Sequence, residues 1–135
     1  MAWIQENMIN ILIAALLAWM LWSRLLAPKL SGVKSMSASD YLNFRHENHA
    51  IVDVRSASEW QSGHPSQARH IPLGEVGKRM EELDKSQPIV VICASGARSS
   101  MAATQLAKAG FDTVYNFSGG MGSWQSAGLP TKKGR

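Results

Sequence analysis

Cys93, the one cysteine of this 135-residue chain, lies in a segment whose residue types suit nucleophilic chemistry. It follows the apolar run 89–92 and opens the segment CASGARSS at 93–100. If that run is a strand and a helix follows the loop, backbone N–H groups and the positive end of the helix face the sulfur. Both favour an anion at Cys93, so we expect its thiolate to form more readily than that of a free cysteine.

The loop after Cys93 combines small residues with one glycine and one arginine. Gly96 allows backbone angles that a side chain would forbid, and Arg98 with nearby hydroxyls could hold an oxyanion beside the sulfur. We therefore predict a substrate-binding loop made of Ala94, Ser95, Gly96, Ala97, Arg98 and Ser99. The alternative is a purely structural Cys93, because a lone cysteine is often a small buried hydrophobe.

Alternating strands and helices are expected to position this loop. Ser37 and Asp40 have the spacing of a capping box at the start of a helix. Apolar patterns predict strands at 50–54, 89–92 and 113–117, and helices starting near 58 and covering 75–83, 98–109 and the surroundings of Trp124. Such alternation is typical of a parallel α/β sheet with helices on both faces, where ligands bind beyond the carboxyl ends of the strands.

The segment from Cys93 to Pro130 resembles the C-terminal half of the rhodanese family almost throughout. The matching features are the cysteine with its loop and arginine, the Gly119-Gly120 turn, Trp124 and, upstream, the segments 51–55, 59–60 and 63–72. The resemblance covers residues 36–130 and implies a rhodanese-like three-layer fold. It departs from the family at 63–68, which reads GHPSQA where members commonly read GHIPGA.

The resemblance implies a sulfurtransferase that needs no cofactor. Cys93 would take sulfane sulfur from thiosulfate or a persulfide and carry it, as a persulfide, to an external thiol or protein acceptor. Asp53 and Arg55 would support the loop, although such a pair at a strand end is more often structural. Ala94 stands where many thiosulfate-using members carry arginine, which leaves Arg98 as the only fixed cation of the loop.

Two rival functions compete with sulfur transfer. Protein tyrosine phosphatases use Cys-x5-Arg, whereas Cys93 and Arg98 are spaced as Cys-x4-Arg, and the smaller cradle favours sulfur over a phosphoryl group. The alternative that we keep is a membrane-tethered, non-catalytic docking module of the same fold, because an intact site is compatible with partner recruitment.

The remaining candidates receive structural interpretations. We predict that His64 stabilises a turn, that His46 and His70 lie at the surface, and that Trp124 belongs to the core. Four scattered histidines and one cysteine give no metal-ligand spacing, so no metal site is predicted. The net charge of +4 is modest and its basic clusters do not interleave with aromatics, which argues against a nucleic-acid partner.

Residues 7–27 are apolar enough and long enough to span a bilayer, which takes ~20 residues. No charge lies between Glu6 and Arg24, and Trp3, Trp19 and Trp22 lie near the ends, where tryptophan prefers the membrane interface. A cleaved signal peptide is disfavoured because no basic residue precedes the run and 25–27 is a poor cleavage site. A buried core helix fits less well because the run lies outside the predicted domain, and an interfacial helix fits less well because the run has no polar face.

The predicted organisation has four parts. They are a transmembrane helix at 1–27, a linker at 28–35, the rhodanese domain at 36–130 and a basic tail at 131–135. Arg24, Lys29 and Lys34 follow the span, so the positive-inside rule places the C-terminal domain in the cytoplasm. We therefore expect a single-pass protein of a bacterial-type inner membrane.

Overall fold

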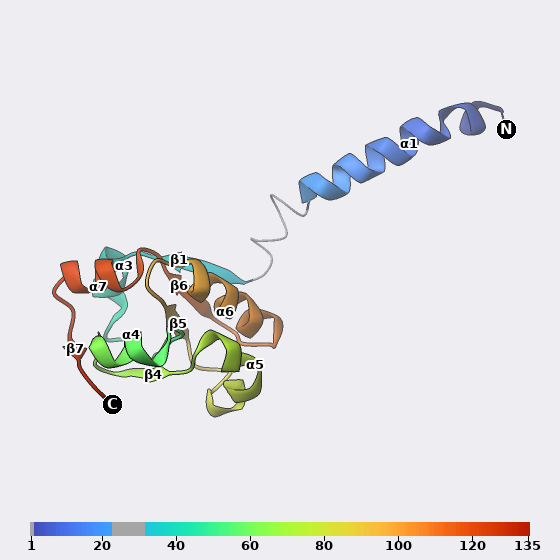
Figure 1. Ribbon diagram of the computed structural model, residues 1–135. Coiled ribbons are helices and arrows are strands. Elements are labelled where there is room, and N and C mark those ends of the chain that lie inside the picture. The colour runs from blue at the N-terminus through green and yellow to red at the C-terminus, as the bar shows by residue number, and fades with distance from the viewer. Residues whose placement is uncertain (1, 23–31) are drawn as a thin grey trace. The chain divides into compact units, whose positions relative to one another are not determined.

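The computed structural model describes residues 2–22 and 32–135, and the chain divides into two compact units, Met1–Ser31 and Gly32–Arg135 (Figure 1). In the first unit, helix α1 covers Ala2–Leu21 and has no buried residue. Its most apolar 18-residue window has a mean hydropathy of 1.5, which is apolar enough to cross a membrane and equally typical of a signal sequence. The end of the predicted span, at 23–27, lies outside the described residues.

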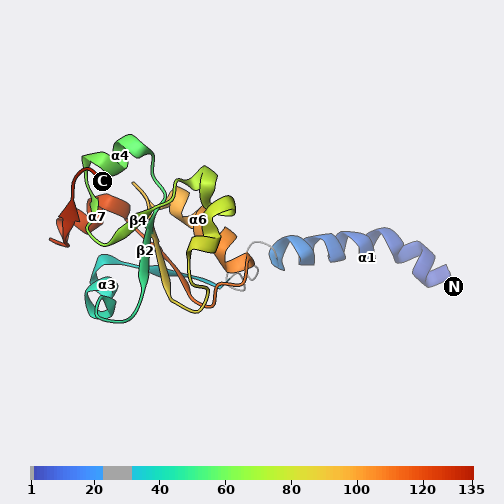
Figure 2. The same ribbon diagram turned by 90° about the horizontal axis from the view of Figure 1, so that it is seen from below.

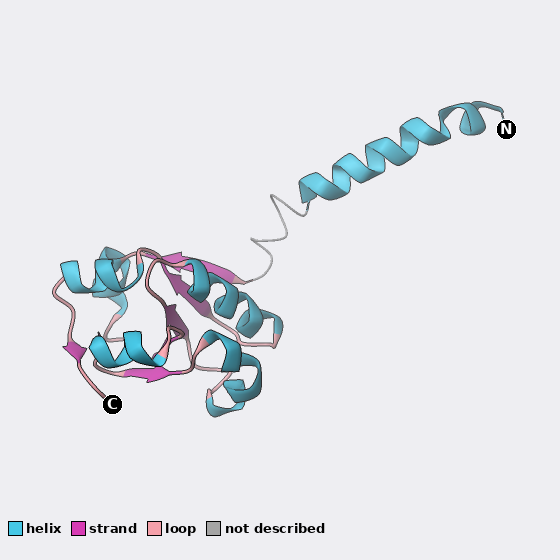
Figure 3. Ribbon diagram, viewed as in Figure 1, coloured by secondary structure: helices cyan, strands magenta, loops and turns pink. Residues whose placement is uncertain are grey.

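The second unit is built on a sheet of five short parallel strands, which Figure 3 colours magenta. In spatial order they are β1 (Val33–Met36), β6 (Val114–Phe117), β5 (Ile89–Ile92), β2 (Ala50–Asp53) and β4 (Ala68–His70). A separate antiparallel pair joins β3 (His64–Pro65) to β7 (Thr131–Lys132). The three strands predicted from apolar runs are β2, β5 and β6, and the most apolar, β5, is central and wholly buried.

Helices cover both faces of the sheet, which confirms the predicted three-layer architecture. They are α3 (Ala38–Phe44), α4 (Ala57–Ser62), α5 (Val76–Arg79), α6 (Ala97–Lys108) and α7 (Gly120–Ser126). Residues of α5 and α6 share one core cluster with Val52, Val91 and Cys93, whereas Tyr41 of α3 and Trp124 of α7 belong to the other. Figure 2 shows α3 and α7 on one side of the sheet and α6 on the other.

Two of the helices begin with a complete capping box. Ser37 accepts a hydrogen bond from the Asp40 N–H, and the Asp40 carboxylate accepts one from the Ser37 N–H, as the spacing predicts. Ser56 and Glu59 repeat this arrangement at the start of α4. The second box fixes where Glu59 lies, which becomes important at the active site.

The predicted helix at 75–83 is broken into three pieces. Two 3₁₀ turns, η2 (Leu73–Glu75) and η3 (Met80–Glu82), flank the single α-helical turn α5. Gly77, inside that turn, lowers the helix propensity, and tertiary packing of buried Val76 holds the segment in place instead.

Both edge strands were absent from the sequence prediction. β1 falls at residues 33–36, so residues 33–35 belong to the sheet and not to the linker predicted at 28–35. Only Met36 of this strand is buried, and β4 has no buried residue at all. Polar residues on short edge strands carry little of the apolar signal by which a strand is recognised.

Candidate active site

Cys93 directly follows β5, the central strand, and therefore lies at the middle of the carboxyl edge of the sheet. Its side chain is fully buried, with an exposed fraction of 0%. The neighbouring strands β2 and β6 end beside it, at Asp53 and Phe117 respectively. Parallel strands thus bring residues that are distant in sequence to the edge where ligands bind in this class of fold.

Hydrogen bonds surround the sulfur of Cys93. The N–H of Gly96 donates to Sγ at 3.0 Å, and the thiol donates to Oγ of Ser99 at 3.3 Å. The Ser99 hydroxyl in turn donates to Oδ1 of Asn116 at 2.5 Å, and Nδ2 of Asn116 donates to the carbonyl of Gly96 at 3.3 Å. Asn116 therefore ties the Cys93 loop to strand β6.

These contacts set the acidity of the thiol. Burial raises the pKa of Cys93, but the hydrogen bond with the Ser99 side chain and those from the N–H groups of Ser99, Ser95 and Gly96 lower it, and the net effect is a lowered pKa. Hydrogen bonds to sulfur that stabilise a thiolate have this effect. The environment thus favours the nucleophilic form of the cysteine.

The Gly119-Gly120 turn packs against the backbone of the Cys93 loop. The N–H of Met121 donates to the carbonyl of Cys93 at 2.9 Å. A Cβ on Gly120, whose φ is 59°, would clash with the carbonyl groups of Cys93 and Ala94. Glycine at 120 therefore allows the start of α7 to approach the backbone of the active loop closely.

Arg98 forms a bidentate ion pair with the carboxylate of Glu59. Its guanidinium makes two parallel hydrogen bonds to Glu59, from Nη1 to Oε1 at 2.7 Å and from Nη2 to Oε2 at 3.0 Å. The Arg98 hydrogen bonds are the largest cause that lowers the Glu59 pKa to about 2, and the Ser56 N–H adds to the effect. Arg98 thus has a carboxylate partner in this structure, and its role in holding an oxyanion beside the sulfur stays a prediction.

Asp53 and Arg55 form a second, buried ion pair at the end of β2. Nη2 of Arg55 lies 2.7 Å from Oδ2 of Asp53 and donates to the carbonyl of Gly63 at 2.7 Å, while Nε contacts both carboxylate oxygens at 3.0 Å. The carbonyl of Arg55 is 2.8 Å from Nε2 of His70. The pair thereby joins β2 to the turn after α4 and to the end of β4.

The positions of the histidines agree only in part with the predictions made from the sequence. His64 is buried at the start of β3 and not in a turn; its Nδ1 lies 2.8 Å from the carbonyl of Trp60, and its ring stacks on Trp60 at 3.4 Å. His70 was predicted to lie at the surface, which is wrong: it is half-buried and stacks on the same ring at 4.9 Å. His46 is exposed, and Trp124 is buried in the core, as predicted.

Comparison with known proteins identifies the family. The family model of the rhodanese-like domain matches residues 37–127. The chain belongs to the rhodanese-like domain family. The match begins after residue 36, so α1 lies outside it.

Two curated relatives and one solved structure show how far the similarity extends. Thiosulfate sulfurtransferase GlpE of Actinobacillus pleuropneumoniae serotype 3 (strain JL03) is 34% identical over 85 residues, which cover 63% of this chain and 79% of GlpE. YrkF of Bacillus subtilis (strain 168), named as a proposed sulfur carrier protein, is 47% identical over 74 residues, which cover 55% of this chain but only 40% of YrkF. The solution NMR structure of the rhodanese-like domain of Anabaena Alr3790 has a TM-score of 0.66 at 30% identity, with 73% of this chain and 78% of that chain covered.

The rhodanese-like domain brings only part of the predicted loop to the sulfur. Sγ is hydrogen-bonded to Gly96 and Ser99, and the N–H of Ser95 also lowers the Cys93 pKa, whereas the side chains of Ala94 and Ala97 are exposed. Asn116 and Glu59 complete the site. Asn116 was not predicted from the sequence, and Glu59 was recognised only through the resemblance to the rhodanese family. Asn116 had one available signal, since it lies near the end of a predicted strand that neighbours β5. Within the described ranges, no group of His, Cys, Asp or Glu could hold a metal ion.

Proposed function

We propose that this rhodanese-like domain is a sulfurtransferase in which Cys93 carries sulfane sulfur as a persulfide. The observation that carries the proposal is the set of donors around the sulfur, which lower the pKa of a fully buried thiol. The names of the relatives, a thiosulfate sulfurtransferase and a proposed sulfur carrier, describe the same chemistry.

In the first step, the Cys93 thiolate attacks the outer sulfur of the donor. A bond forms between Sγ and that sulfur, and the sulfur–sulfur bond of the donor breaks. With thiosulfate, sulfite leaves with the bonding electron pair and Cys93 becomes a persulfide anion, so no oxidant or reductant is needed. Once the thiol proton has passed to water, the Ser99 hydroxyl turns from Asn116 to the sulfur, and Asn116 still positions the loop through its hydrogen bond to the carbonyl of Gly96.

In the second step, an external thiolate attacks the outer sulfur of the persulfide. The bond to Sγ breaks, the acceptor leaves as a persulfide, and Cys93 returns to the thiolate. Cys93 is the only cysteine of the chain, so the acceptor thiol comes from another molecule. The loop N–H groups stabilise the negative charge of both the thiolate and the persulfide. The reaction is nucleophilic catalysis, because a covalent intermediate divides the transfer into two steps.

Access to the sulfur requires a rearrangement of the loop, because Cys93 has no exposed surface. Arg98 is placed to respond to an anionic donor, since its partner Glu59 is about a third exposed. We propose that the donor anion exchanges with Glu59 for the guanidinium. Surface ion pairs contribute about 0–1 kcal/mol, so this exchange meets little resistance.

Mass spectrometry after incubation with thiosulfate tests the proposal. The full chain should gain the mass of one sulfur atom at Cys93, and addition of cyanide should remove it as thiocyanate. Cys93→Ser should show neither the adduct nor turnover, since the chain has no other thiol. A wild-type chain that never forms the adduct with thiosulfate or with a small persulfide would exclude the proposed reaction.

The alternative function is a docking module that retains the fold without turnover. Full burial of Cys93 and the engagement of Arg98 by Glu59 both favour it, because the sulfur and the cation are occupied within the domain. Adduct formation separates the two functions, since a docking module has no need of a sulfur-loaded cysteine.

We also propose that α1 anchors the domain as a single membrane-spanning helix of a bacterial-type inner membrane. Support comes from its 20-residue length, its lack of any buried residue and the absence of charge after Glu6 within it. The full chain should then resist alkaline carbonate extraction from membranes. Recovery of a chain whose N-terminus begins near Pro28 would instead identify α1 as a cleaved signal.

The positive charges at Arg24, Lys29 and Lys34 support a cytoplasmic position for the domain. Protease added to intact spheroplasts should leave the domain uncut and should degrade it only after lysis. Degradation before lysis would place the sulfur chemistry outside the cytoplasm. The four-part division at 1–27, 28–35, 36–130 and 131–135 stays a prediction, with its domain boundary moved to the start of β1.

A further inference from the structure

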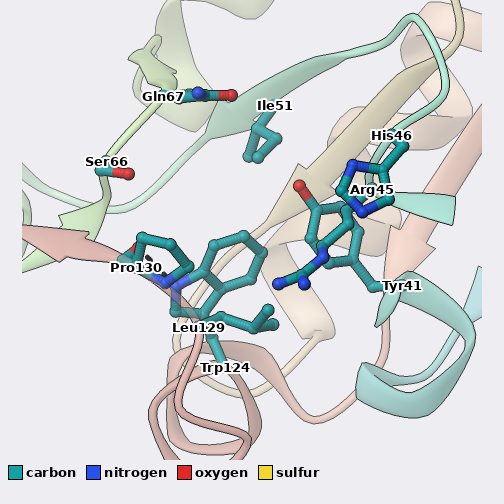
Figure 4. A pocket seen from close by; sticks show the side chains of 9 residues that line it. All are labelled: Tyr41, Arg45, His46, Ile51, Ser66, Gln67, Trp124, Leu129 and Pro130. Atoms are coloured by element: carbon teal, nitrogen blue, oxygen red, sulfur yellow. Dashed lines mark hydrogen bonds between the residues drawn. The ribbon is translucent and has the colours of Figure 1, made fainter. Parts of the chain in front are cut away.

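A cavity of about 230 Å³ lies within the second unit, apart from the Cys93 loop (Figure 4). Its lining comes from α3 and the turn after it, from β2, from the β3–β4 turn, and from α7 with the segment that follows. The lining residues are Tyr41, Arg45, His46, Ile51, Ser66, Gln67, Trp124, Leu129 and Pro130. None of them belongs to the loop 93–99, so the cavity is separate from the site of the proposed sulfur transfer.

The floor of the cavity is apolar and rigid. Ile51, Trp124 and Leu129 are 4%, 2% and 5% exposed, and all three belong to one core cluster. The indole N–H of Trp124 donates to the carbonyl of Pro130 at 3.0 Å, which fixes the ring at the base. A preformed apolar floor suits a ring or a branched alkyl group.

The rim of the cavity is polar and positively charged. Arg45 and His46 lie on one side of it, with Ser66 and Gln67 opposite, as Figure 4 shows. No aspartate or glutamate lines the cavity. Within residues 2–22 and 32–135, the arginines that form ion pairs are Arg55, Arg69, Arg79 and Arg98. Arg45 therefore has no carboxylate partner in this part of the chain.

We propose that this cavity binds a small molecule in which an apolar ring or branched group carries a carboxylate. The apolar group lies on Trp124 and Leu129, and the carboxylate lies at Arg45, with Ser66 or Gln67 as a further hydrogen-bond donor. A volume of about 230 Å³ has room for a single ring with a short acidic arm. Carboxylate–arginine pairing supplies the selectivity for an anion.

A matched series of probes tests the ligand class on the full chain in detergent micelles. Phenylacetate, phenylacetamide and phenethylamine share a ring and differ in charge, while acetate has the charge without the ring. The readout is the indole N–H signal of Trp124 in a protein NMR titration. Phenylacetate should shift this signal saturably and bind at least about ten-fold tighter than phenylacetamide, because the charge-assisted bond is lost with the amide.

Variants of the rim assign the binding to the cavity. Arg45→Gln should weaken phenylacetate binding by about ten- to hundred-fold and remove the preference over phenylacetamide. Ser66→Phe should block binding by filling the cavity from its exposed rim. Lys108→Gln removes the same charge from α6, which contributes no lining residue, and should leave binding unchanged.

Two outcomes would overturn this inference. Shifts confined to Trp3, Trp19 and Trp22 would show that the probe only partitions around α1. Equal binding of phenylacetate and phenylacetamide at Trp124 would show that Arg45 does not select an anion. Neither result bears on sulfur transfer at Cys93, so the two proposals can fail independently.

Discussion

Two arginine–carboxylate pairs at the carboxyl edge of the sheet differ sharply in burial. The side chains of Arg55 and Asp53 are 7% and 0% exposed, whereas those of Arg98 and Glu59 are 37% and 35% exposed. Both pairs are well bonded: the Arg55 guanidinium also donates to the carbonyl of Gly63, while that of Arg98 bonds Glu59 through two nitrogens. The same chemistry thus occurs once inside the domain and once at its surface.

The difference in burial separates a pair that holds the fold from a pair that can be exchanged. A buried charge without its partner is strongly destabilising, because no water replaces the lost interaction. An exposed pair contributes about 0–1 kcal/mol, since water solvates each partner when they separate. We therefore assign the Asp53–Arg55 pair to structure and the Glu59–Arg98 pair to the binding of an anionic donor.

Breaking the buried pair should produce the largest effect. Asp53→Ala leaves the Arg55 guanidinium buried without a counter-charge, so we expect the free energy of unfolding to fall by about 3–5 kcal/mol. Urea unfolding of the full chain in mild detergent, followed by the near-UV signal of the domain, measures this change. Asp84→Ala is the matched control, because it removes an exposed carboxylate and should cost less than about 1 kcal/mol. A loss below about 1 kcal/mol for Asp53→Ala would remove the distinction between the two pairs.

Breaking the exposed pair from the arginine side should affect transfer more than stability. Arg98→Ala should reduce sulfur transfer from thiosulfate by about 10- to 100-fold, the scale of one charge-assisted hydrogen bond of ~1.5–3 kcal/mol. It should also raise the pKa of Cys93, because a nearby positive charge is lost. The free energy of unfolding should change by less than about 1 kcal/mol.

The control for Arg98 is another exposed arginine with a glutamate partner. Arg69 lies 2.9 Å from Glu82, with side chains 51% and 38% exposed, and it is distant in sequence from the Cys93 loop. Arg69→Ala should match Arg98→Ala in stability and leave transfer unchanged. Equal transfer by the wild type and Arg98→Ala would show that Arg98 takes no part in sulfur transfer.

The sequence predicted the strands and the helix that position Cys93 because their signals are local. The three apolar runs that were predicted as strands correspond to β2, β5 and β6. A helix begins at the Ser37–Asp40 capping box, as the spacing predicts. The segments that were missed or broken, β1, β4 and the helix at 75–83, are short, polar or interrupted by glycine. Their conformation depends on neighbouring strands and packed side chains, which no local window contains.

Side-chain pairing at the site was harder to predict for the same reason. The partners Glu59 and Arg98 are 39 residues apart, and Ser99 and Asn116 are 17 apart. A motif indicates that Arg98 follows Cys93 at a fixed spacing, but not in which direction its guanidinium points. The direction of the guanidinium depends on the position of Glu59 in α4, which only the folded domain shows.

Removing the Ser99 hydroxyl should reduce sulfur transfer less than removing the positive charge of Arg98. Ser99→Ala removes the side-chain hydrogen bond that lowers the pKa of Cys93, so that pKa should rise. Transfer should fall by about five-fold, the scale of a neutral hydrogen bond worth ~1 kcal/mol. Ser100→Ala is the matched control, because Ser100 is exposed and adjacent. The pH dependence of Cys93 alkylation measures both variants, and an unchanged profile for Ser99→Ala would leave the loop N–H groups as the sole cause of the acidity.

Breaking the exposed pair from the carboxylate side should have the smallest effect on stability and the clearest dependence on charge. The Glu59 pKa is lowered from 4.5 to about 2, first by the Arg98 hydrogen bonds. Because the folded pKa lies below the unfolded one, the stabilisation is present above about pH 4.5 and is lost as the pH falls towards 2. Exposure limits it to less than about 1 kcal/mol. Glu59→Gln, which retains the capping box, should therefore be slightly less stable than the wild type at pH 7 and equally stable near pH 2.

The same variant frees Arg98 to meet an anion at the sulfur. Cys93 should then react faster with iodoacetate, an anion, while its reaction with neutral iodoacetamide changes little. The ratio of the two alkylation rates isolates the charge of Arg98 from general loosening of the loop, which would accelerate both reagents together. We expect the ratio to rise by several-fold in Glu59→Gln and to fall below the wild-type value in Arg98→Ala, since ~1 kcal/mol corresponds to about five-fold in rate. A ratio that is the same in all three proteins would mean that Arg98 stays away from the sulfur even when its carboxylate partner is gone.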